Sequence, residues 1–352
     1  MIDIKNVKIT PDILRKIADV DAFNGRWQGK RERLKTEELH SMKRIATIES
    51  VGSSNRIEGN KMTDMAIETL FENISRKSFA DRDEEEVAGY ADLLNTIFDN
   101  YTEIKLSENY IKQLHQIMLR YSQKDERHRG EYKKDTNRVV AFDSQGKEIG
   151  VIFETASAFD TPRLMSELVE WTNRNLADGY LHPLIVIGVF IVHFLAIHPF
   201  SDGNGRLSRA MTILLMLQSG YEYMPYASME SVVEATKDSY YRALRGTQKN
   251  IWKDEVDYEP WLVYFLTSLQ KQKGVLEEKL LNLNSPKKKE FSRVEEKIFD
   301  LFETRKDWTV GEMSKQLEIS TETVRKAVYG MVEKGCLDRK GQGRSTWYEK
   351  RI

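Results

Sequence analysis

Apolar positions along the chain recur mostly at helical spacing, so the sequence predicts a mainly α-helical protein. Between Thr36 and Val51 the apolar residues stand three or four positions apart, as on one face of a helix. The helix expected from Thr161 carries its apolar residues at similar intervals. The run from Leu184 to Ile197 is apolar on almost every side, which predicts a buried helix.

Two short apolar stretches in the middle of the chain predict a β-hairpin instead. Residues 139–142 and 149–153 flank the segment 143–146, whose sequence Asp-Ser-Gln-Gly is typical of a turn. Both arms are rich in valine, isoleucine and phenylalanine, which favour strands. On the local sequence alone, this is an ordinary surface hairpin.

Breaks in the pattern divide the chain into four parts. Helical residues 1–100 come first, and residues 101–270 form the expected core. Charged residues 271–290 make a helical linker, where the run Asn-Ser-Pro-Lys-Lys-Lys at 284–289 ends the helical pattern. Residues 291–352 are expected to form a separate C-terminal domain.

The C-terminal domain has the order of elements found in winged helices. Its pattern predicts a helix over residues 294–302, a second helix capped by Thr309, and a third helix from residue 319 to Gly335. Two strands then flank a glycine-containing turn at residues 341–344. Helix, turn, helix and wing together resemble the winged-helix fold, a small α+β domain.

The winged-helix resemblance implies either DNA or protein as the partner of residues 291–352. Charge does not decide between them, because this domain has 13 Lys and Arg residues against 11 Asp and Glu, a net charge of +2. That excess is small for a surface that follows the phosphates of DNA. If DNA is the partner, the expected contacts are Thr321, Thr323, Arg325, Lys326, Arg339, Lys340 and Arg344.

The densest group of polar residues follows the helix that ends near Ile197. His198 comes first, and Pro199 biases it away from helical geometry, so its imidazole is expected at the end of a rigid element. An unperturbed imidazole titrates near pH ~6.5, which suits a general base at neutral pH.

A turn over Gly203, Asn204 and Gly205 is expected next. The glycines take positive φ at little cost, so that successive N–H groups can point inward and bind an anion. Apolar residues from Leu207 to Leu217 predict another helix, whose N-terminus adds unpaired N–H groups facing the same anion.

Asp202, Arg206 and Arg209 complete this group. A carboxylate suits Mg²⁺ that is shared with phosphates. The two arginines stand three positions apart and share a helix face, and guanidinium groups match phosphate oxygens. These residue types together predict a site that holds a polyphosphate while a nucleophile attacks it.

Residues 198–209 resemble the signature HxFx(D/E)GNGRxxR of the Fic family, and every fixed position matches. Fic proteins are mostly nucleotidyltransferases that move AMP from ATP onto a Ser, Thr or Tyr hydroxyl of a target protein. The resemblance implies a Fic-type helical bundle with a β-hairpin flap. It assigns these roles: general base His198, Mg²⁺ ligand Asp202, α-phosphate ligand Asn204 with the backbone of Gly203 and Gly205, and outer-phosphate ligands Arg206 and Arg209.

A second motif lies upstream, where Ser54 and Glu58 stand four positions apart before Gly59. On a helix this spacing puts the hydroxyl and the carboxylate on one face. By itself the motif is typical of an ordinary helix end. Beside the Fic signature, it resembles the inhibitory helix (S/T)xxxE(G/N) of that family. The resemblance implies that Glu58 pairs with Arg209 and keeps the enzyme autoinhibited.

The resemblance also implies where the two substrates bind. The hairpin at residues 139–153 corresponds to a flap along which a target protein adds a strand. Tyr240 and Tyr241 correspond to tyrosines beside the adenine, and Gln248 replaces an asparagine seven residues after the second tyrosine. The local pattern fits a pair of core aromatic residues as well.

Composition excludes several other classes of protein. Among 352 residues with a net charge of −1, the single Cys336 excludes an internal disulfide and a multi-cysteine zinc site. Residues 184–197 are too few to cross a membrane, and the N-terminus lacks the apolar segment of a signal peptide. We expect a cytoplasmic protein without a structural metal, and the resemblance implies a homodimer.

Two other functions stay open for the same residues. A core that only senses nucleotide would make the protein a DNA-binding transcription regulator, whose phenotypes survive replacement of His198. Alternatively, the pocket transfers another phosphate-linked group, or removes AMP from a target while Glu58 positions a water. The same pocket serves each reaction, so the sequence does not separate them.

Overall fold

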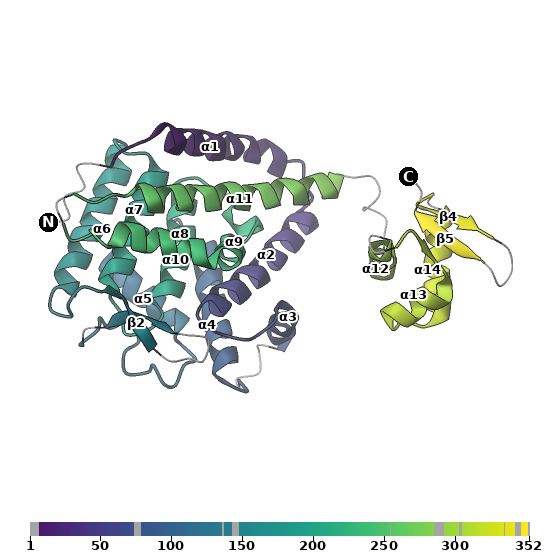
Figure 1. Ribbon diagram of the computed structural model, residues 1–352, viewed down its shortest axis with the longest axis horizontal. Coiled ribbons are helices and arrows are strands. Elements are labelled where there is room, and N and C mark those ends of the chain that lie inside the picture. The colour runs from purple at the N-terminus through teal and green to yellow at the C-terminus, as the bar shows by residue number, and fades with distance from the viewer. Residues whose placement is uncertain are drawn as a thin grey trace. The chain divides into compact units, whose positions relative to one another are not determined.

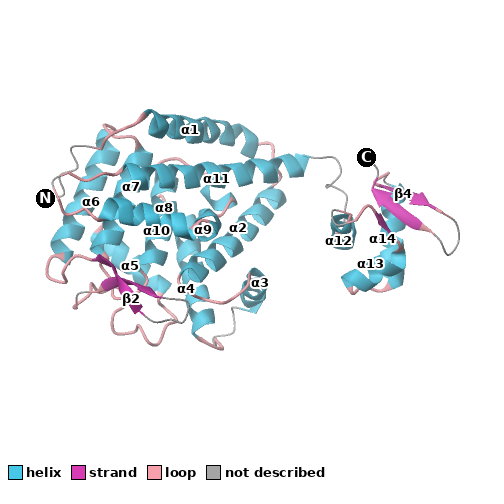
Figure 2. Cartoon of the chain, in the orientation of Figure 1, coloured by secondary structure: helices cyan, strands magenta, loops and turns pink. Residues whose placement is uncertain are grey.

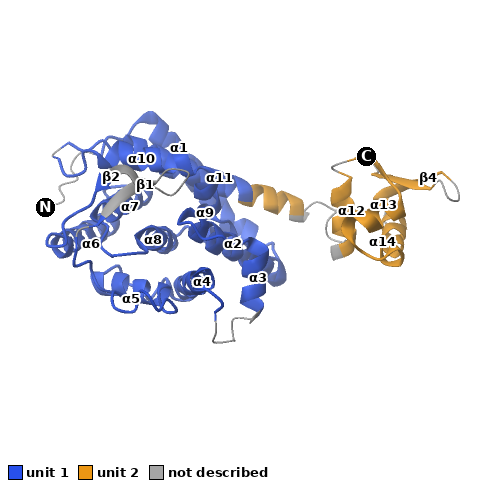
Figure 3. Ribbon diagram, turned by 60° about the horizontal axis from the view of Figure 1, so that its bottom comes forward, with its two compact units in different colours: residues 1–275 blue, residues 276–352 orange. Residues whose placement is uncertain are grey.

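The computed structural model places most of its residues in helices, which confirms the predicted mainly α class (Figure 1, Figure 2). Contacts divide the chain into two compact units, residues 1–275 and 276–352 (Figure 3). The finer boundaries at residues 100, 270 and 290 stay predictions. The structure describes residues 7–73, 79–135, 137–142, 148–253, 255–284, 292–302, 305–333, 335–341 and 346–350.

The larger unit is built from helices and one strand pair. Figure 1 shows α1 and α11 side by side, where Lys273 and Gln270 of α11 both contact Asp19 of α1. The helices are α1 (Pro11–Arg31), α2 (Thr36–Ile57), α3 (Asp64–Asn73), α4 (Arg82–Asn100), α5 (Glu108–Met118), α6 (Thr161–Asp178), α7 (Pro183–Ile197), α8 (Asn204–Gln218), α9 (Met229–Ala235), α10 (Lys237–Gln248) and α11 (Glu259–Asn284), which continues into the smaller unit.

Helix α7 is the centre of this unit, as its apolar sequence predicts. Every residue from Leu184 to Ile197 is buried, and α6, α8 and α10 pack around it. The indole N–H of Trp261 in α11 donates to the carbonyl oxygen of Gly188 at 2.6 Å. A side chain at Gly188 would lie 2.7 Å from Leu262, so the glycine permits this close approach of the two helices. The rigid core therefore fixes where α7 ends.

The predicted hairpin is confirmed in the described part of the larger unit. Strands β1 (Arg138–Phe142) and β2 (Glu148–Glu154) pair antiparallel, with Arg138 opposite Glu154 and Phe142 opposite Glu148. The turn expected at residues 143–146 lies outside the described residues.

In its described residues, the smaller unit contains the end of α11, three further helices and a three-stranded antiparallel sheet of order β3-β5-β4. The two-residue strand β3 was not expected from the sequence, and the third helix ends at Glu333 rather than at Gly335. The wing turn with Arg344 lies outside the described residues, and the winged-helix assignment stays a prediction. The elements are α12 (Arg293–Leu301), β3 (Asp307–Trp308), α13 (Val310–Leu317), α14 (Thr321–Glu333), β4 (Leu337–Lys340) and β5 (Trp347–Lys350).

A buried apolar cluster holds these elements together. The second helix begins with a capping box, in which Thr309 and Glu312 each bond the backbone N–H of the other residue. The helices and the sheet share one apolar core, which is the property of a unit that can fold independently. The cluster consists of Ile298, Phe302, Met313, Val324, Val328, Met331, Leu337 and Tyr348.

Helices α4 and α5 touch through a glycine, which gives a test of this packing. A Cβ at Gly89 of α4 would overlap the carbonyl oxygen of Met118 at the end of α5. The Gly89→Ala variant is therefore expected to lose about 2 kcal/mol or more of its free energy of unfolding in urea. In the matched control Gly29→Ala, the added methyl meets open space on α1, so stability should rise by up to about 1 kcal/mol. Equal effects of both changes would contradict the packing.

Candidate functional site

One open cavity collects most of the residues predicted to be functional. It lies where the end of α7, the start of α8, the end of α2 and one face of α10 meet, and its empty volume is about 770 Å³. This is within the range of small-molecule sites. The predicted residues that line it are Glu58, His198, Asp202, Gly203, Asn204, Gly205, Arg209, Tyr240, Tyr241 and Gln248.

His198 ends α7 in a left-handed conformation, with φ 53° and ψ 61°. Its Nδ1 lies 3.3 Å from the carbonyl oxygen of Leu195. Because a carbonyl only accepts hydrogen bonds, Nδ1 carries the proton, and Nε2 keeps a lone pair. Burial of the ring lowers the pKa of His198 to about 4, below its unperturbed value. The imidazole is therefore neutral at pH 7 and able to accept a proton.

The first turn of α8 forms the expected anion site, but with a different geometry. Gly203 has a φ of 78° and precedes the helix, which begins at Asn204 rather than at Leu207. The prediction of one turn over Gly203, Asn204 and Gly205 is therefore wrong for the last two residues. No side chain among those described caps this helix. Its first N–H groups and its positive dipole end are left for an anion at the cavity.

The Asn204 side chain shapes the loop that leads into α8. Its Oδ1 accepts from the backbone N–H of Phe200 at 2.9 Å, and its Nδ2 donates to the carbonyl oxygen of Phe200 at 2.8 Å. The side chain is 1% exposed. These bonds hold the loop from Phe200 to Gly203 in the conformation that presents both His198 and the helix N-terminus to the cavity.

The structure brings Ser54 and Glu58 onto Arg209. The Arg209 guanidinium donates from Nη2 to Glu58 Oε1 and to the Ser54 carbonyl oxygen, both at 2.8 Å. Its Nε donates to Ser54 Oγ at 2.8 Å. Burial alone would lower the pKa of Arg209, but the charge and the hydrogen bond of Glu58, together with Tyr240 and Tyr90, outweigh the effect of burial and raise the pKa. Gly205 lies beneath this pair, and a Cβ there would overlap the Glu58 carboxylate.

Arg206 does not lie among the described residues that line the cavity. Its guanidinium is buried and lies 3.2 Å from Glu86 of α4 and 3.7 Å from Asp202. Arg82 bridges the same two carboxylates from the other side, at 2.7 and 3.3 Å. The four side chains form a ring of alternating charge, in which Arg206 fixes Asp202 and the start of α8. The Fic resemblance implies that Arg206 binds the outer phosphates. No motif in the sequence indicates Arg82 or Glu86.

Asp202 suits a magnesium ion that takes its other ligands elsewhere. Its carboxylate is 41% exposed and borders the cavity. One oxygen accepts the backbone N–H of Gly203 at 2.6 Å. The described residues contain no group of three or more His, Cys, Asp or Glu side chains that could hold a metal. Mg²⁺ commonly binds through one carboxylate together with substrate phosphates and water, so the donor present fits it.

His115 supports the loop from the side away from the cavity, and no motif in the sequence indicates this role. Its Nδ1 accepts from the backbone N–H of Gly130 at 2.9 Å, so Nε2 carries the proton and donates to the Asp202 carbonyl oxygen at 3.1 Å. The ring stacks on Phe200 with 3.9 Å between centroids. Burial lowers the pKa of His115 to about 4. A lone histidine on a helix face ordinarily indicates only core packing, so only the structure reveals this role.

Lys133 connects the base of the β1–β2 hairpin to the loop that follows α7 through hydrogen bonds. Its buried ammonium group donates to Asn137, Thr155 and the carbonyl oxygen of Ile197, at 2.8, 2.9 and 2.9 Å. Burial lowers the pKa of Lys133 to about 8. Asn137 in turn donates to the carbonyl oxygen of Phe200 at 2.9 Å. The hairpin and the loop that carries His198 therefore share one hydrogen-bond network.

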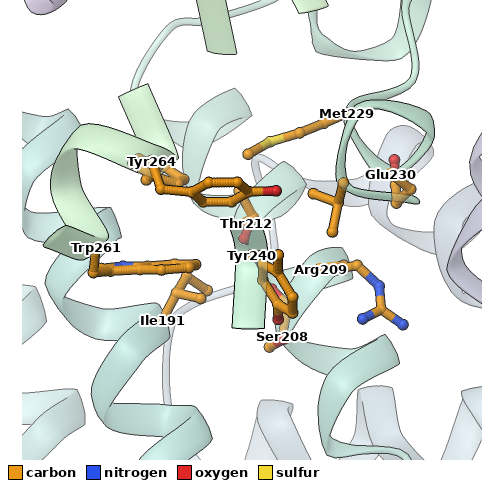
Figure 4. Close-up of a pocket in the computed structure, with 11 residues that line it drawn as sticks. Ile191, Ser208, Arg209, Thr212, Met229, Glu230, Tyr240, Trp261 and Tyr264 are labelled. Carbon is orange, nitrogen blue, oxygen red and sulfur yellow. Dashed lines mark hydrogen bonds between the residues drawn. The ribbon is translucent and has the colours of Figure 1, made fainter. Parts of the chain in front are cut away.

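Helix α10 forms an aromatic wall of the cavity. Tyr240 and Tyr241 pack edge to face with centroids 5.1 Å apart, and Gln248 lies two turns further along the same helix. Tyr240 and Arg209 also line a second, apolar pocket behind the cavity. Figure 4 shows this pocket, with the rings of Trp261 and Tyr264 beside Tyr240. Arg209 is thus held between two cavities.

Comparison with known proteins identifies the central segment. Residues 105–216, from just before α5 to near the end of α8, match the model of the Fic/DOC family. A protein of Aquifex aeolicus named "Probable protein adenylyltransferase" is 24% identical over 109 residues, which are 31% of this chain and 33% of that protein. The "Protein adenylyltransferase Fic" of Drosophila willistoni is 36% identical over 62 residues, 18% of this chain and 12% of that protein. The chain therefore spans one third or less of these relatives.

Solved structures share the fold over a longer stretch. A Fic family protein from Desulfovibrio desulfuricans has a TM-score of 0.63 and 21% identity, covering 98% of this chain and 97% of that chain. A Fic domain containing signaling protein from Bacteroides thetaiotaomicron has a TM-score of 0.59 and 23% identity, covering 77% of this chain and 97% of that chain. These likenesses confirm the predicted Fic-type helical fold.

The buried neutral histidine behind the loop predicts how stability depends on pH. The folded-state pKa of His115, about 4, lies below the value near ~6.5 of an unfolded chain, so protonation favours unfolding. Its contribution to stability is present above pH ~6.5 and is lost as the pH falls toward 4. When the pH is lowered from 6 to 5, the free energy of unfolding should therefore fall less in His115→Gln than in the wild type, by up to about 1.4 kcal/mol.

The measurement is urea unfolding at a series of pH values. The control is His40→Gln, which removes an exposed histidine of α2 and should keep the wild-type slope. Parallel curves for the wild type and His115→Gln would show that His115 is not buried in its neutral form.

Proposed function

We propose that the protein transfers AMP from ATP to a hydroxyl group of a target protein, and that Glu58 holds it inactive. The observation that carries this proposal is the shared cavity of a neutral His198 and the uncapped N-terminus of α8. A base and an anion site within one pocket suit the attack of a hydroxyl on a bound phosphate. The adenylyltransferases among the relatives support the same reaction class.

In the proposed reaction, Nε2 of His198 takes the proton of the target hydroxyl. The hydroxyl oxygen forms a bond to the α-phosphorus of ATP, while the bond from that phosphorus to the pyrophosphate oxygen breaks. The N–H groups at the start of α8 stabilise the negative charge on the α-phosphate. Magnesium, when bound, would be held by Asp202 and would offset the charge of the phosphates. The protein mainly positions the reactants.

We assign the nucleoside to the wall of α10. Tyr240 and Tyr241 offer aromatic surface next to Arg209, and Gln248 offers an amide at the far end of the same helix. Amide groups recognise the edge of adenine through paired hydrogen bonds. The cavity also has the volume that a nucleotide needs.

Autoinhibition follows from the state of Arg209. All the contacts described above commit its guanidinium to Ser54 and Glu58, so that it is not available to a terminal phosphate. The Glu58 carboxylate also repels phosphate oxygens at the position that they would take. ATP would then bind without the contact that orients its outer phosphates, and the α-phosphorus would not align with the attacking hydroxyl.

The proposal extends to the partners of the protein. The edge of the β1–β2 hairpin would receive the target protein as an added strand. Residues 291–352 would bind DNA or a protein partner, and two copies of the chain would form a homodimer in the cytoplasm. In the described ranges, no helix combines the length and apolar character needed to cross a membrane.

Removal of the Glu58 side chain tests the proposal. With ATP and Mg²⁺, Glu58→Gly is expected to transfer AMP about 5- to 150-fold faster than the wild type, because Arg209 becomes free. Intact mass spectrometry would detect AMP on the protein itself, and pyrophosphate release would report transfer to an added target. The Glu58→Gly/His198→Ala variant is the control, and its rate should be about 100-fold or more below that of Glu58→Gly.

The binding of ATP is measured separately by isothermal titration calorimetry. If Glu58→Gly binds ATP and forms neither AMP-protein nor pyrophosphate, the proposed reaction is wrong, and the cavity only senses nucleotide. If the wild type is already as fast as Glu58→Gly, the reaction stands and autoinhibition is refuted.

A further inference from the structure

We infer that Arg56 is a positioning residue, which acts by anchoring the end of α2 so that Glu58 stays on Arg209. The inference rests on the proposed function and extends it, because it assigns the control of the inhibitory contact to a residue outside the cavity. Arg56 precedes Glu58 by two positions, which on a helix turns the two side chains about 200° apart. Among the described residues, neither cavity wall includes Arg56.

Arg56 is held by two carboxylates from separate parts of the chain. Its Nε and Nη2 donate to the two oxygens of Glu234 in α9, at 2.7 and 3.0 Å. Its Nη1 donates to Asp64 at the start of α3 and to the carbonyl oxygen of Met62, at 2.8 and 3.1 Å. A bidentate pair of this kind fixes both distance and orientation. The last turn of α2 is therefore tied to α9 and α3.

Gly52 makes room for this anchor. It stands one turn before Arg56 on α2, and a Cβ there would lie 2.5 Å from both Arg56 Nη1 and Asp64 Oδ1. The glycine is in the interior of a 22-residue helix, where it costs stability relative to alanine. A residue of low helix propensity therefore stands at the position where the Arg56–Asp64 pair needs space.

A second tie comes from the start of α10. The ammonium group of Lys237 donates to the carbonyl oxygen of Ile57 at 2.7 Å, which satisfies a carbonyl left open at the end of α2. Glu234 and Lys237 thus hold Arg56 and Ile57, the two residues that precede Glu58. The helix that begins at Lys237 also carries Tyr240 and Tyr241. The elements that anchor the inhibitory residue are therefore continuous with the wall assigned to the nucleoside.

The ion pairs of Arg56 are partly exposed to solvent. Side-chain exposures are 24% for Arg56, 31% for Glu234 and 48% for Asp64. A partly exposed ion pair contributes modestly, so its loss should free Glu58 in part rather than fully. We expect Arg56→Ala to speed AMP transfer about fivefold while Glu58 is still present. Gly52→Ala should act in the same direction, although alanine favours the helix.

The matched control is Arg44→Ala. Arg44 also lies on α2 and pairs with Glu68 and Glu72 of α3, at 3.3 and 3.4 Å, but it is about four turns from Glu58. Its loss should leave the rate unchanged. Unfolding in urea checks that every variant is folded.

Two comparisons separate the positioning role from general loosening. In a Glu58→Gly background, Arg56→Ala should add nothing, since its effect passes through Glu58. Hydrogen exchange of the amides of Glu58, Gly59 and Asn60, which bond to carbonyls at the end of α2, should become faster in Arg56→Ala and stay unchanged in Arg44→Ala. Exchange does not depend on the reaction, so it tests the anchor even if the proposed function fails.

Three results would overturn the inference. One is a Glu58→Gly variant that is activated while Arg56→Ala has the wild-type rate. Another is a gain from Arg56→Ala that persists in the Glu58→Gly background. The last is unchanged amide exchange at residues 58–60 in Arg56→Ala. A failure of Glu58→Gly itself would instead refute the proposed function, with the exchange result still deciding the anchor.

Discussion

Arg209 is a cation in the interior of the protein, 7% exposed, and the rest of the site is arranged around the need to neutralise it. A buried charge without a partner is costly. Ser54 and Glu58 meet that need in the structure, at the end of a helix that belongs to the N-terminal part of the chain. Whatever displaces Glu58 has to bring negative charge of its own. In the proposed function, Glu58 and the phosphates of ATP would therefore compete to neutralise Arg209.

The loop and helix start near Arg209 are held by contacts that do not involve Glu58. Arg82, Glu86, Arg206 and Asp202 form a closed ring that joins α4 to the start of α8. His115 holds the same loop through its backbone. A site on helices packed against a rigid core keeps its geometry when one contact changes. At the end of α2, Arg56 adds ion pairs with Glu234 and Asp64 to the packing of its buried residues.

The sequence could predict what is local. Residues 198–209 are contiguous, so their residue types alone indicated a base, an anion site and a carboxylate. The buried helix, the hairpin and the pairing of Ser54 and Glu58 on one face also follow from periodicity. The sequence does not predict where α8 starts, because Gly203 and Gly205 both suit a turn, whereas only Gly203 has a positive φ. Arg206, Glu86 and Arg56 find their partners through tertiary packing, which leaves no local pattern to read.

The tautomer of His198 is set by a main-chain group. In many enzymes a carboxylate side chain fixes the tautomer of the catalytic histidine, and one substitution of that carboxylate reverses it. Here the fixing group is the carbonyl oxygen of Leu195, in the last turn of α7. Every residue type at that position provides the same acceptor. The side chain at position 195 can therefore vary without changing which nitrogen of His198 carries the proton, as long as the last turn of α7 is kept.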